Sequence, residues 1–233
     1  MPPKDKRVNE TLAWLKKNGS PRVREQMTTQ FAIHAPKSFG IHMAPMQKIA
    51  KRLGRDHDLA AALWATGWYE ARTIAAYVDD PALVTAAQMD RWCKDFDNWG
   101  ICDTVCFKLF DQTPHAFKKV KQWASKREEF VKRASFALLA SLALHDKTSG
   151  DEPFVSCLPL IEKAATDDRN FVKKGVSWAL RSVGRRSAAL NAASVELAKR
   201  LAESDDASAR WIGKESLKDL TKPALVQRLK ASA

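Results

Sequence analysis

The sequence predicts an all-α protein built from repeated helical hairpins. Only nine glycines occur in 233 residues, and no segment keeps the strict apolar–polar alternation of a half-buried strand. Amphipathic helical patterning instead covers almost the whole chain. An Asp-Asp pair also recurs at 79–80, 167–168 and 205–206; the first two copies are 88 residues apart and the last two are 38 apart.

A spacing near 40 residues is typical of HEAT and armadillo arrays, in which each helical hairpin buries its apolar face by stacking on the next. Such a stack curves and creates a concave surface. We therefore expect a HEAT-like helical-repeat solenoid with a concave basic groove, forming a single domain over 1–233, with the helices at about 8–34 less clearly part of it. Each pair is expected where a helix begins, with its carboxylates accepting the free amide hydrogens there. The alternative to a repeat is that Asp-Asp is simply a common way to open a helix.

The individual helices follow from their start and stop signals. Ser20 caps the second of two N-terminal amphipathic helices, with Pro21 in its first turn, and 35–42 is a Pro-, Gly- and Ser-rich loop. The polar segment 145–153 is too short for a domain linker, so it is expected to be a loop between repeats. The predicted helices are 9–17, 21–34, 45–53, 58–65, 70–78, 81–96, 99–110, 114–125, 127–144, 153–166, 171–183, 188–203, 207–220 and 223–231.

Composition favours an acidic partner and offers no metal site. The chain has 39 Lys and Arg against 27 Asp and Glu, a formal charge of +12, which suits nucleic acid first and an anionic membrane surface second. No apolar run approaches the roughly 20 residues that span a bilayer, and the N-terminus is polar. Four cysteines form no Cys-x-x-Cys pair, and five histidines are scattered. We expect a cytoplasmic protein, nucleoid-associated in a bacterium or nuclear in a eukaryote, without metal, cofactor or membrane.

The strongest charge feature is a stretch without acidic residues between Asp168 and Glu196. Its cations are Arg169, Lys173, Lys174, Arg181, Arg185 and Arg186. On a continuous helix, Lys174, Trp178, Arg181 and Arg185 follow one another at steps of four, three and four residues and share one face. A cationic stripe around an aromatic ring suits DNA. A solvated helix face with one core Trp explains this segment equally well.

A second candidate site lies at the start of the predicted helix 99–110. Asn98 is suited to cap that helix, Trp99 falls in its first turn, and Asp103 follows one turn deeper on the same face. Because Asp103 lies beyond the first turn, compensation of the helix dipole does not easily explain it. Taken alone, an exposed polar edge is the favoured interpretation of this carboxylate, and a functional group is the alternative.

Several segments together resemble the DNA alkylation repair family, the AlkD-type HEAT-like repeat glycosylases. The similarity covers roughly 31–220, and no single motif decides it. The matching segments, in order, are Gly40 with Pro45, Lys48-Ile-Ala50, Leu63-Trp64, Glu70-Ala-Arg72 with Ala75, Asn98-Trp99 through Asp103, Arg133 within Phe-Val-Lys-Arg-Ala, and Trp178-Ala-Leu-Arg181.

The resemblance implies a repair glycosylase that grips duplex DNA and hydrolyses the N-glycosidic bond of cationic N-alkylated purines, such as 3-methyladenine and 7-methylguanine. It assigns Asp103 as the catalytic carboxylate, Trp99 and Trp178 as the aromatic pair beside the lesion, and Arg133 as the residue that holds the DNA backbone there. Further DNA contacts are expected from the cations on and beside these helices. They are Lys132, Lys173, Lys174, Arg181 and Arg185.

Those residue types fit the chemistry. A cationic base is a good leaving group, and the sugar becomes an oxocarbenium ion as the bond breaks. A fixed carboxylate stabilises that cation and orients water, while Trp faces attract cationic groups at roughly 0.5–2 kcal/mol each. Neither metal nor cofactor is required, and we expect a monomer acting on double-stranded DNA.

The chain also departs from the family pattern. Asn98 and Gly100 replace an aromatic and an acidic residue around the first Trp, and the missing side chain at Gly100 would widen the cleft. The alternatives are therefore a non-catalytic HEAT-repeat binder of branched or distorted DNA, and a protein–protein scaffold. The remaining tryptophans are expected to pack in the core or at its edge. They are Trp14, Trp64, Trp68, Trp92, Trp123 and Trp211.

Overall fold

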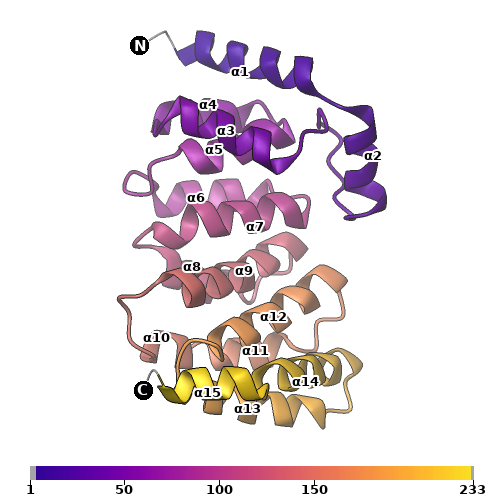
Figure 1. Cartoon of the computed structure of the whole chain (residues 1–233), viewed down its shortest axis with the longest axis vertical. Helices are drawn as coiled ribbons and strands as arrows, with labels where there is room; N and C mark the ends of the chain where they lie inside the picture. The colour runs from indigo at the N-terminus through magenta and orange to yellow at the C-terminus, as the bar shows by residue number, and fades with distance from the viewer. Residues whose placement is uncertain (1–3, 232–233) are drawn as a thin grey trace. The chain divides into compact units, whose positions relative to one another are not determined.

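The computed structural model describes residues 4–231, and this part of the chain is all-α, with no strand (Figure 1). The prediction that the protein is all-α is therefore confirmed. The helices are α1 (Lys4–Asn18), α2 (Pro21–Thr29), α3 (Met43–Leu53), α4 (His57–Ala65), α5 (Tyr69–Val78), α6 (Ala86–Lys94), α7 (Trp99–Lys108), the 3₁₀ helix η1 (Phe110–Gln112), α8 (Ala116–Trp123), α9 (Glu129–His145), α10 (Glu152–Val155), α11 (Leu158–Ala164), α12 (Asn170–Val183), α13 (Ala188–Ala202), α14 (Ala207–Leu220) and α15 (Pro223–Ala231).

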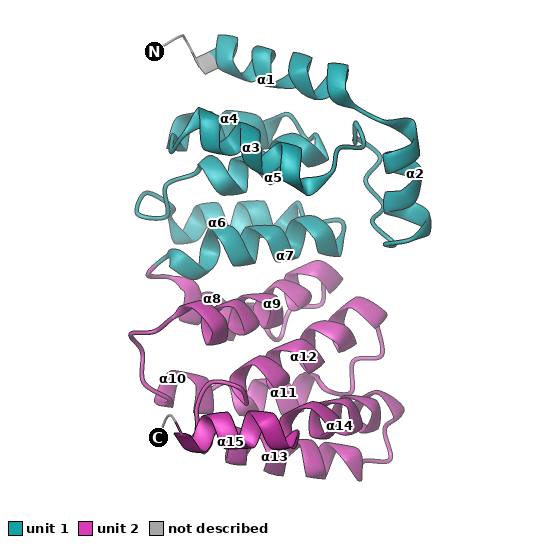
Figure 2. Ribbon diagram, in the orientation of Figure 1, with its two compact units in different colours: residues 1–113 teal, residues 114–233 magenta. Residues whose placement is uncertain are grey.

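The chain divides into two compact units, residues 1–113 and 114–233 (Figure 2). In unit 1, α5 is the central helix: it packs against α3, α4 and α7, while α1 lies against α4. Its core holds fully buried Leu59, Leu63 and Ile74, and Trp64 stacks on Trp92 with ring centroids 4.0 Å apart. Aromatic stacking of this kind adds about 1 kcal/mol to the burial of the rings.

In unit 2, α9 and α12 form the main helix pair, α12 also packs against α14, and α13 packs against α14. The inner part of α9 is almost wholly buried, with Phe136, Leu138 and Leu139 inaccessible to solvent. A helix that is apolar on nearly every side needs neighbours around it. The α9 sequence therefore makes it the core of this unit, and α8 and α12 are two of those neighbours.

Several helix boundaries differ from the sequence prediction; the first helix, for instance, begins at Lys4 and not at Asn9. The predicted helix 153–166 is two short helices, α10 and α11, because Pro159 has no amide hydrogen and its ring would clash with the carbonyl one turn earlier in a continuous helix. The predicted helix 21–34 ends at Thr29, after which Ala32 takes a left-handed φ of 51° and the Ile33 amide donates to the Met27 carbonyl. The predicted helix 81–96 begins only at Ala86, where the Thr85 side chain caps it.

The Asp-Asp pairs do not share one role. Asp206 caps α14 as predicted, since its Oδ1 accepts a hydrogen bond from the Ala209 amide at 2.8 Å. Asp79 instead is buried, accepting from Gln88 Nε2 at 2.7 Å and pairing with His57 Nδ1 at 2.6 Å. Asp167 precedes α12 without capping it. The prediction that a helix begins at the 79–80 pair is therefore wrong, whereas the 167–168 pair does precede α12 but leaves it uncapped. In both pairs the first carboxylate is engaged by side chains from other segments.

A buried carboxylate fixes the loop between α2 and α3. Glu70, in the first turn of α5, is 0 % exposed and accepts hydrogen bonds from Ser38 Oγ at 2.7 Å, from the Phe39 amide at 3.0 Å and from the Gly40 amide at 2.9 Å. Gly40 has φ of +77°, and a Cβ there would lie 2.2 Å from the Ser20 carbonyl oxygen. Gly40 therefore lets the loop pass close to the start of α2 while its amide reaches the Glu70 carboxylate.

Candidate nucleic-acid interface

The first group of candidate residues lies in unit 1, on the first two turns of α7. Asn98 caps the helix as predicted: its Oδ1 accepts from the Ile101 amide at 3.1 Å, and its Nδ2 donates to Asp97 Oδ1 at 2.7 Å. The cap holds the first turn, which contains Trp99. Because Asp103 follows four residues later on a regular helix, its carboxyl and the Trp99 indole lie on one side of α7.

Trp99 is anchored to a distant segment. Its indole Nε1 donates a hydrogen bond of 2.8 Å to the carbonyl oxygen of Phe31, which follows the end of α2. Trp99 is half-buried, and the Phe31 side chain is itself exposed. The hydrogen bond fixes the orientation of the indole plane, which α7 alone leaves free to rotate.

Asp103 lies at the border between the buried and the exposed side of α7. It is half-buried, whereas its neighbours Ile101, Cys102 and Cys106 are buried. Burial, with added contributions from Cys102, Cys93 and the Asp103 carboxylate, raises the pKa of the Cys106 thiol. The four cysteines are free thiols, and within residues 4–231 no cluster of His, Cys, Asp and Glu has the arrangement of a metal site.

Gly100 does not widen a cleft. A Cβ at this position would lie 2.8 Å from Tyr69 Oη and 3.0 Å from Ile33 Cδ1, so neighbouring side chains already occupy the space. Burial also raises the pKa of Tyr69 to about 12, which keeps this phenol neutral beside α7. The sequence-based expectation for Gly100 is therefore wrong: the glycine lets α5 and the segment after α2 approach α7 closely.

The second group of candidate residues lies in unit 2, on α9 and α12. Arg133 is only 6 % exposed, and its Nη1 donates to the Phe171 carbonyl oxygen at 2.6 Å. A Cβ on Gly175 of α12 would lie 3.5 Å from Arg133 Cγ, so the arginine packs directly on that helix. Arg133 thus joins α9 to α12, and contact with a phosphate would require its guanidinium to move.

Three of the four residues predicted to form the cationic stripe lie on one helical face. Lys174, Trp178 and Arg181 share one side of α12; Lys174 is exposed, and Trp178 and Arg181 are half-buried. Arg181 Nε donates to the Ser177 carbonyl at 3.2 Å. The helix ends at Val183, so Arg185 lies in the following turn and not on the predicted helical face.

Two of the predicted DNA-binding cations are engaged by buried or half-buried carboxylates. Arg185 Nη2 lies 2.5 Å from Asp219 Oδ2, and Lys132 Nζ lies 2.8 Å from Asp167 Oδ2. Hydrogen bonds from Arg169, opposed by burial and assisted by Lys132, hold the pKa of Asp167 far below its usual value. These cations are partly neutralised within the protein, whereas exposed Lys174 makes no ion pair within residues 4–231.

Some residues that the sequence assigned to packing are accessible. Trp64, Trp92 and Trp123 are buried, as predicted. Trp211 is 38 % exposed, however, and the Lys173 ammonium lies 5.3 Å from its ring centroid. Trp211 follows Asp206 by five residues on α14, and only packing of α14 against α12 brings it to Lys173. No local sequence signal indicates that contact.

The structure therefore brings the predicted residues together in two groups. Trp99 and Asp103 adjoin each other on α7 in unit 1. Arg133, Trp178 and the cations predicted to bind DNA lie on or beside the α9–α12 pair in unit 2. Among residues 4–231, no helix is long and apolar enough to cross a membrane.

The paired helices define a HEAT-like repeat fold, and one solved structure supports that class over nearly the whole chain. It is described as a new family of proteins related to the HEAT-like repeat DNA glycosylases, with affinity for branched DNA structures; it has a TM-score of 0.74 and 21 % identity, covering 89 % of this chain and 93 % of that chain. The family model for DNA alkylation repair enzymes matches residues 11–220, so the chain belongs to the DNA alkylation repair enzyme family.

Two designed armadillo repeat proteins are more distant. One, in complex with the peptide (KR)4, has a TM-score of 0.40 and 11 % identity, covering 91 % of this chain and 87 % of the other. The second has a TM-score of 0.34 and 11 % identity, covering 86 % and 99 %. No curated protein sequence matches the chain significantly.

Proposed function

We propose that this protein is a DNA glycosylase that releases cationic N-alkylated purines, of the 3-methyladenine and 7-methylguanine type, from duplex DNA. The observation that carries the proposal is the pair on α7. Asp103 lies one helical turn beyond Trp99, whose indole is held by the Phe31 carbonyl at 2.8 Å. Family membership supports this assignment.

In the proposed reaction the bond between C1′ and the base nitrogen breaks, and its electron pair leaves with the base and neutralises the positive charge of the purine. The sugar becomes an oxocarbenium ion, which the Asp103 carboxylate stabilises. Water then adds to C1′, and its proton passes to Asp103 or to solvent. The Trp99 ring packs on the sugar or on the cationic base, where its π face is favourable.

DNA binding is assigned to the cations of unit 2. Lys174 is exposed, and Arg181 follows it by two turns on the same side of α12. Lys173, Arg185 and Lys132 add positive potential although each contacts a protein group. Trp178 is proposed as the second aromatic residue, and Arg133 as the residue that orders the α9–α12 surface for the DNA backbone.

Single-turnover release of 7-methylguanine from methylated duplex tests the proposal. Asp103→Asn keeps the shape and removes the charge, so we expect base release to slow by about 100-fold or more, with duplex affinity within about twofold. Asp58→Asn, which removes an exposed carboxylate from α4, is the matched control and should behave as wild type. Wild-type release by Asp103→Asn would exclude this carboxylate from the reaction.

A second candidate function is non-catalytic binding of branched DNA. It is favoured by the solved structure with a TM-score of 0.74, which is described as having affinity for branched DNA. Measurements on the wild-type protein distinguish this alternative from the glycosylase proposal. Tight binding to a four-way junction without release of 7-methylguanine or 3-methyladenine would replace the glycosylase proposal.

A further inference from the structure

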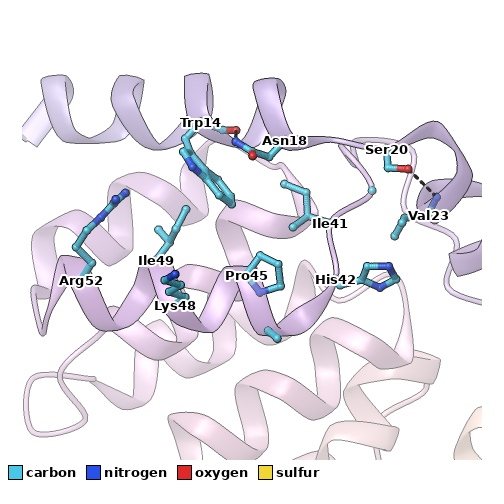
Figure 3. A pocket seen from close by; sticks show the side chains of 12 residues that line it. Trp14, Asn18, Ser20, Val23, Ile41, His42, Pro45, Lys48, Ile49 and Arg52 are labelled. Atoms are coloured by element: carbon cyan, nitrogen blue, oxygen red, sulfur yellow. Dashed lines mark hydrogen bonds between the residues drawn. The ribbon is translucent and has the colours of Figure 1, made fainter.

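Unit 1 contains a cleft that the proposed glycosylase site does not use. It has a volume of about 720 Å³ and lies between α1, the start of α2 and α3 (Figure 3). Figure 3 shows the Trp14 side chain extending from α1 towards α3, with Pro45, Lys48, Ile49 and Arg52 on α3. A volume of this size is in the range of small-ligand sites.

The lining of this cleft combines a flat apolar surface with positive charge. Trp14, Ile41 and Ile49 supply apolar surface, while Lys48 and Arg52 are exposed cations one helical turn apart. No carboxylate is among the residues that line the cleft. Within residues 4–231, neither cation makes a hydrogen bond or an ion pair, so both are available to an anion.

Trp14 differs from two other tryptophans of unit 1, Trp64 and Trp99, whose indoles are held by hydrogen bonds. Trp64 Nε1 donates to Asp95 Oδ2 at 2.8 Å, and Trp99 Nε1 donates to the Phe31 carbonyl at 2.8 Å. The Trp14 indole is half-buried and makes no hydrogen bond within the described part of the chain. Because this half-buried ring lines the cleft, it is suited to contact a ligand that enters there.

These features suit an unpaired nucleotide. Its base offers an aromatic face to Trp14, and its phosphates offer negative charge to Lys48 and Arg52. In a duplex the faces of the bases are covered by their neighbours, and only base edges are accessible. A single strand also extends beyond the cleft, where exposed Lys51 adjoins Arg52 and exposed Arg24 has its backbone against Gly40 in the cleft wall.

We propose that the cleft between α1 and α3 binds an unpaired nucleotide within a single-stranded DNA segment, with the base stacked on Trp14 and its phosphates on Lys48 and Arg52. This site is separate from the pair on α7 and does not depend on base release. It would give the protein affinity for flaps and other single-stranded arms beside a duplex.

The first test compares an oligothymidylate with a blunt duplex by fluorescence anisotropy at constant salt. Trp14→Leu should weaken oligothymidylate binding by about tenfold and duplex binding by less than about twofold. Trp14→Phe, which keeps an aromatic face, should retain most of the affinity. Unchanged binding by Trp14→Leu, or equal loss for both DNAs, would overturn the proposal.

A charge comparison and a crosslink complete the test. Lys48→Gln with Arg52→Gln should reduce oligothymidylate affinity more than Lys16→Gln with Lys17→Gln, an equal charge change on α1 outside the cleft lining. With wild-type protein, an oligothymidylate carrying 5-iodouracil should photocrosslink to Trp14, and adducts only elsewhere would contradict the assignment. If thymidine monophosphate binds as tightly as the oligomer, the ligand is a free nucleotide and the single-strand proposal is wrong.

Methylated duplex separates this proposal from the glycosylase proposal. Trp14→Leu should release 7-methylguanine from blunt duplex at the wild-type rate, because the cleft acts on single strands. Loss of base release in that variant, with circular dichroism and thermal stability unchanged, would contradict a site separate from catalysis.

Discussion

The Trp99 indole and the Phe31 main chain are joined by a hydrogen bond of 2.8 Å across 68 residues of sequence. The segment after α2 therefore sets the orientation of an aromatic ring at the start of α7. The connection makes the N-terminal helices relevant to the candidate active site, although the sequence left their role open.

Trp99→Phe should reduce base release without unfolding the protein. The variant keeps an aromatic ring but loses the Nε1 donor, so the free energy of unfolding should fall by about 1 kcal/mol. Without the hydrogen bond the ring is also freer to rotate. We expect about tenfold slower single-turnover release. Trp68→Phe is the control, since Trp68 stacks on Phe39 at 3.9 Å and its indole makes no hydrogen bond within the described residues. Equal effects of the two changes would indicate a general loss of packing.

Gly100→Ala should destabilise the protein by about 1–3 kcal/mol, because the new methyl group would overpack against Tyr69 and Ile33. Urea unfolding measures the effect. Gly150→Ala is a suitable comparison: a Cβ there meets nothing within 4 Å, and we expect its stability to stay within about 0.5 kcal/mol of wild type. If Gly100→Ala is as stable as wild type, the close approach at α7 is not required.

Glu70→Gln should be among the most destabilising conservative changes in unit 1. The amide keeps one acceptor oxygen but places an NH₂ group against donors of the loop at 38–40, and a loss of roughly 3 kcal/mol follows from breaking buried charged hydrogen bonds. Thermal and urea unfolding, with the exposed-site change Glu25→Gln as a control, measure it. A loss no larger than that of the control would refute the anchoring role of Glu70.

Lys174→Gln and Arg185→Gln should have different effects. Exposed Lys174 is expected to contribute about one unit to the slope of log affinity against log salt for duplex DNA, with little change in stability. Arg185→Gln removes one of the two cationic partners of buried Asp219, leaving Lys222, and should cost about 1 kcal/mol of stability, with a smaller change in salt slope. Identical salt slopes for wild type and Lys174→Gln would remove Lys174 from the DNA interface.

Acid should weaken unit 2 through Asp167. Hydrogen bonds from Arg169 and Lys132 keep the pKa of this carboxyl in the folded state below its unfolded value near 4. The stabilisation is therefore complete above about pH 4 and is lost as the pH falls towards the folded-state pKa. Asp167→Asn should lower the melting temperature at neutral pH. At pH 3 the difference in melting temperature between the variant and wild type should be smaller. A constant difference across that range would contradict this linkage.

The sequence was sufficient for those features that depend on neighbouring residues. Helical periodicity identified almost every helix, and the Asn98 and Asp206 caps were confirmed because a cap bonds amides only a few residues away. The spacing of Trp99 and Asp103 on one side of α7 also follows from helix geometry alone. Motifs that follow the family's order over most of the chain also indicated the DNA alkylation repair family, whose family model matches residues 11–220.

Tertiary structure decided which side chains remain accessible. Arg133 and Arg185 appear in the sequence as ordinary cations, yet the Phe171 carbonyl and the Asp219 carboxylate engage them within unit 2. Trp14 resembles a core residue in sequence, yet it lines a cleft because α1 and α3 leave space around it. Partners from distant helices determine burial and hydrogen bonding, and no local pattern encodes which helices will meet. The sequence by itself thus determined the helices and their motifs, and packing determined the chemical environment of each candidate residue.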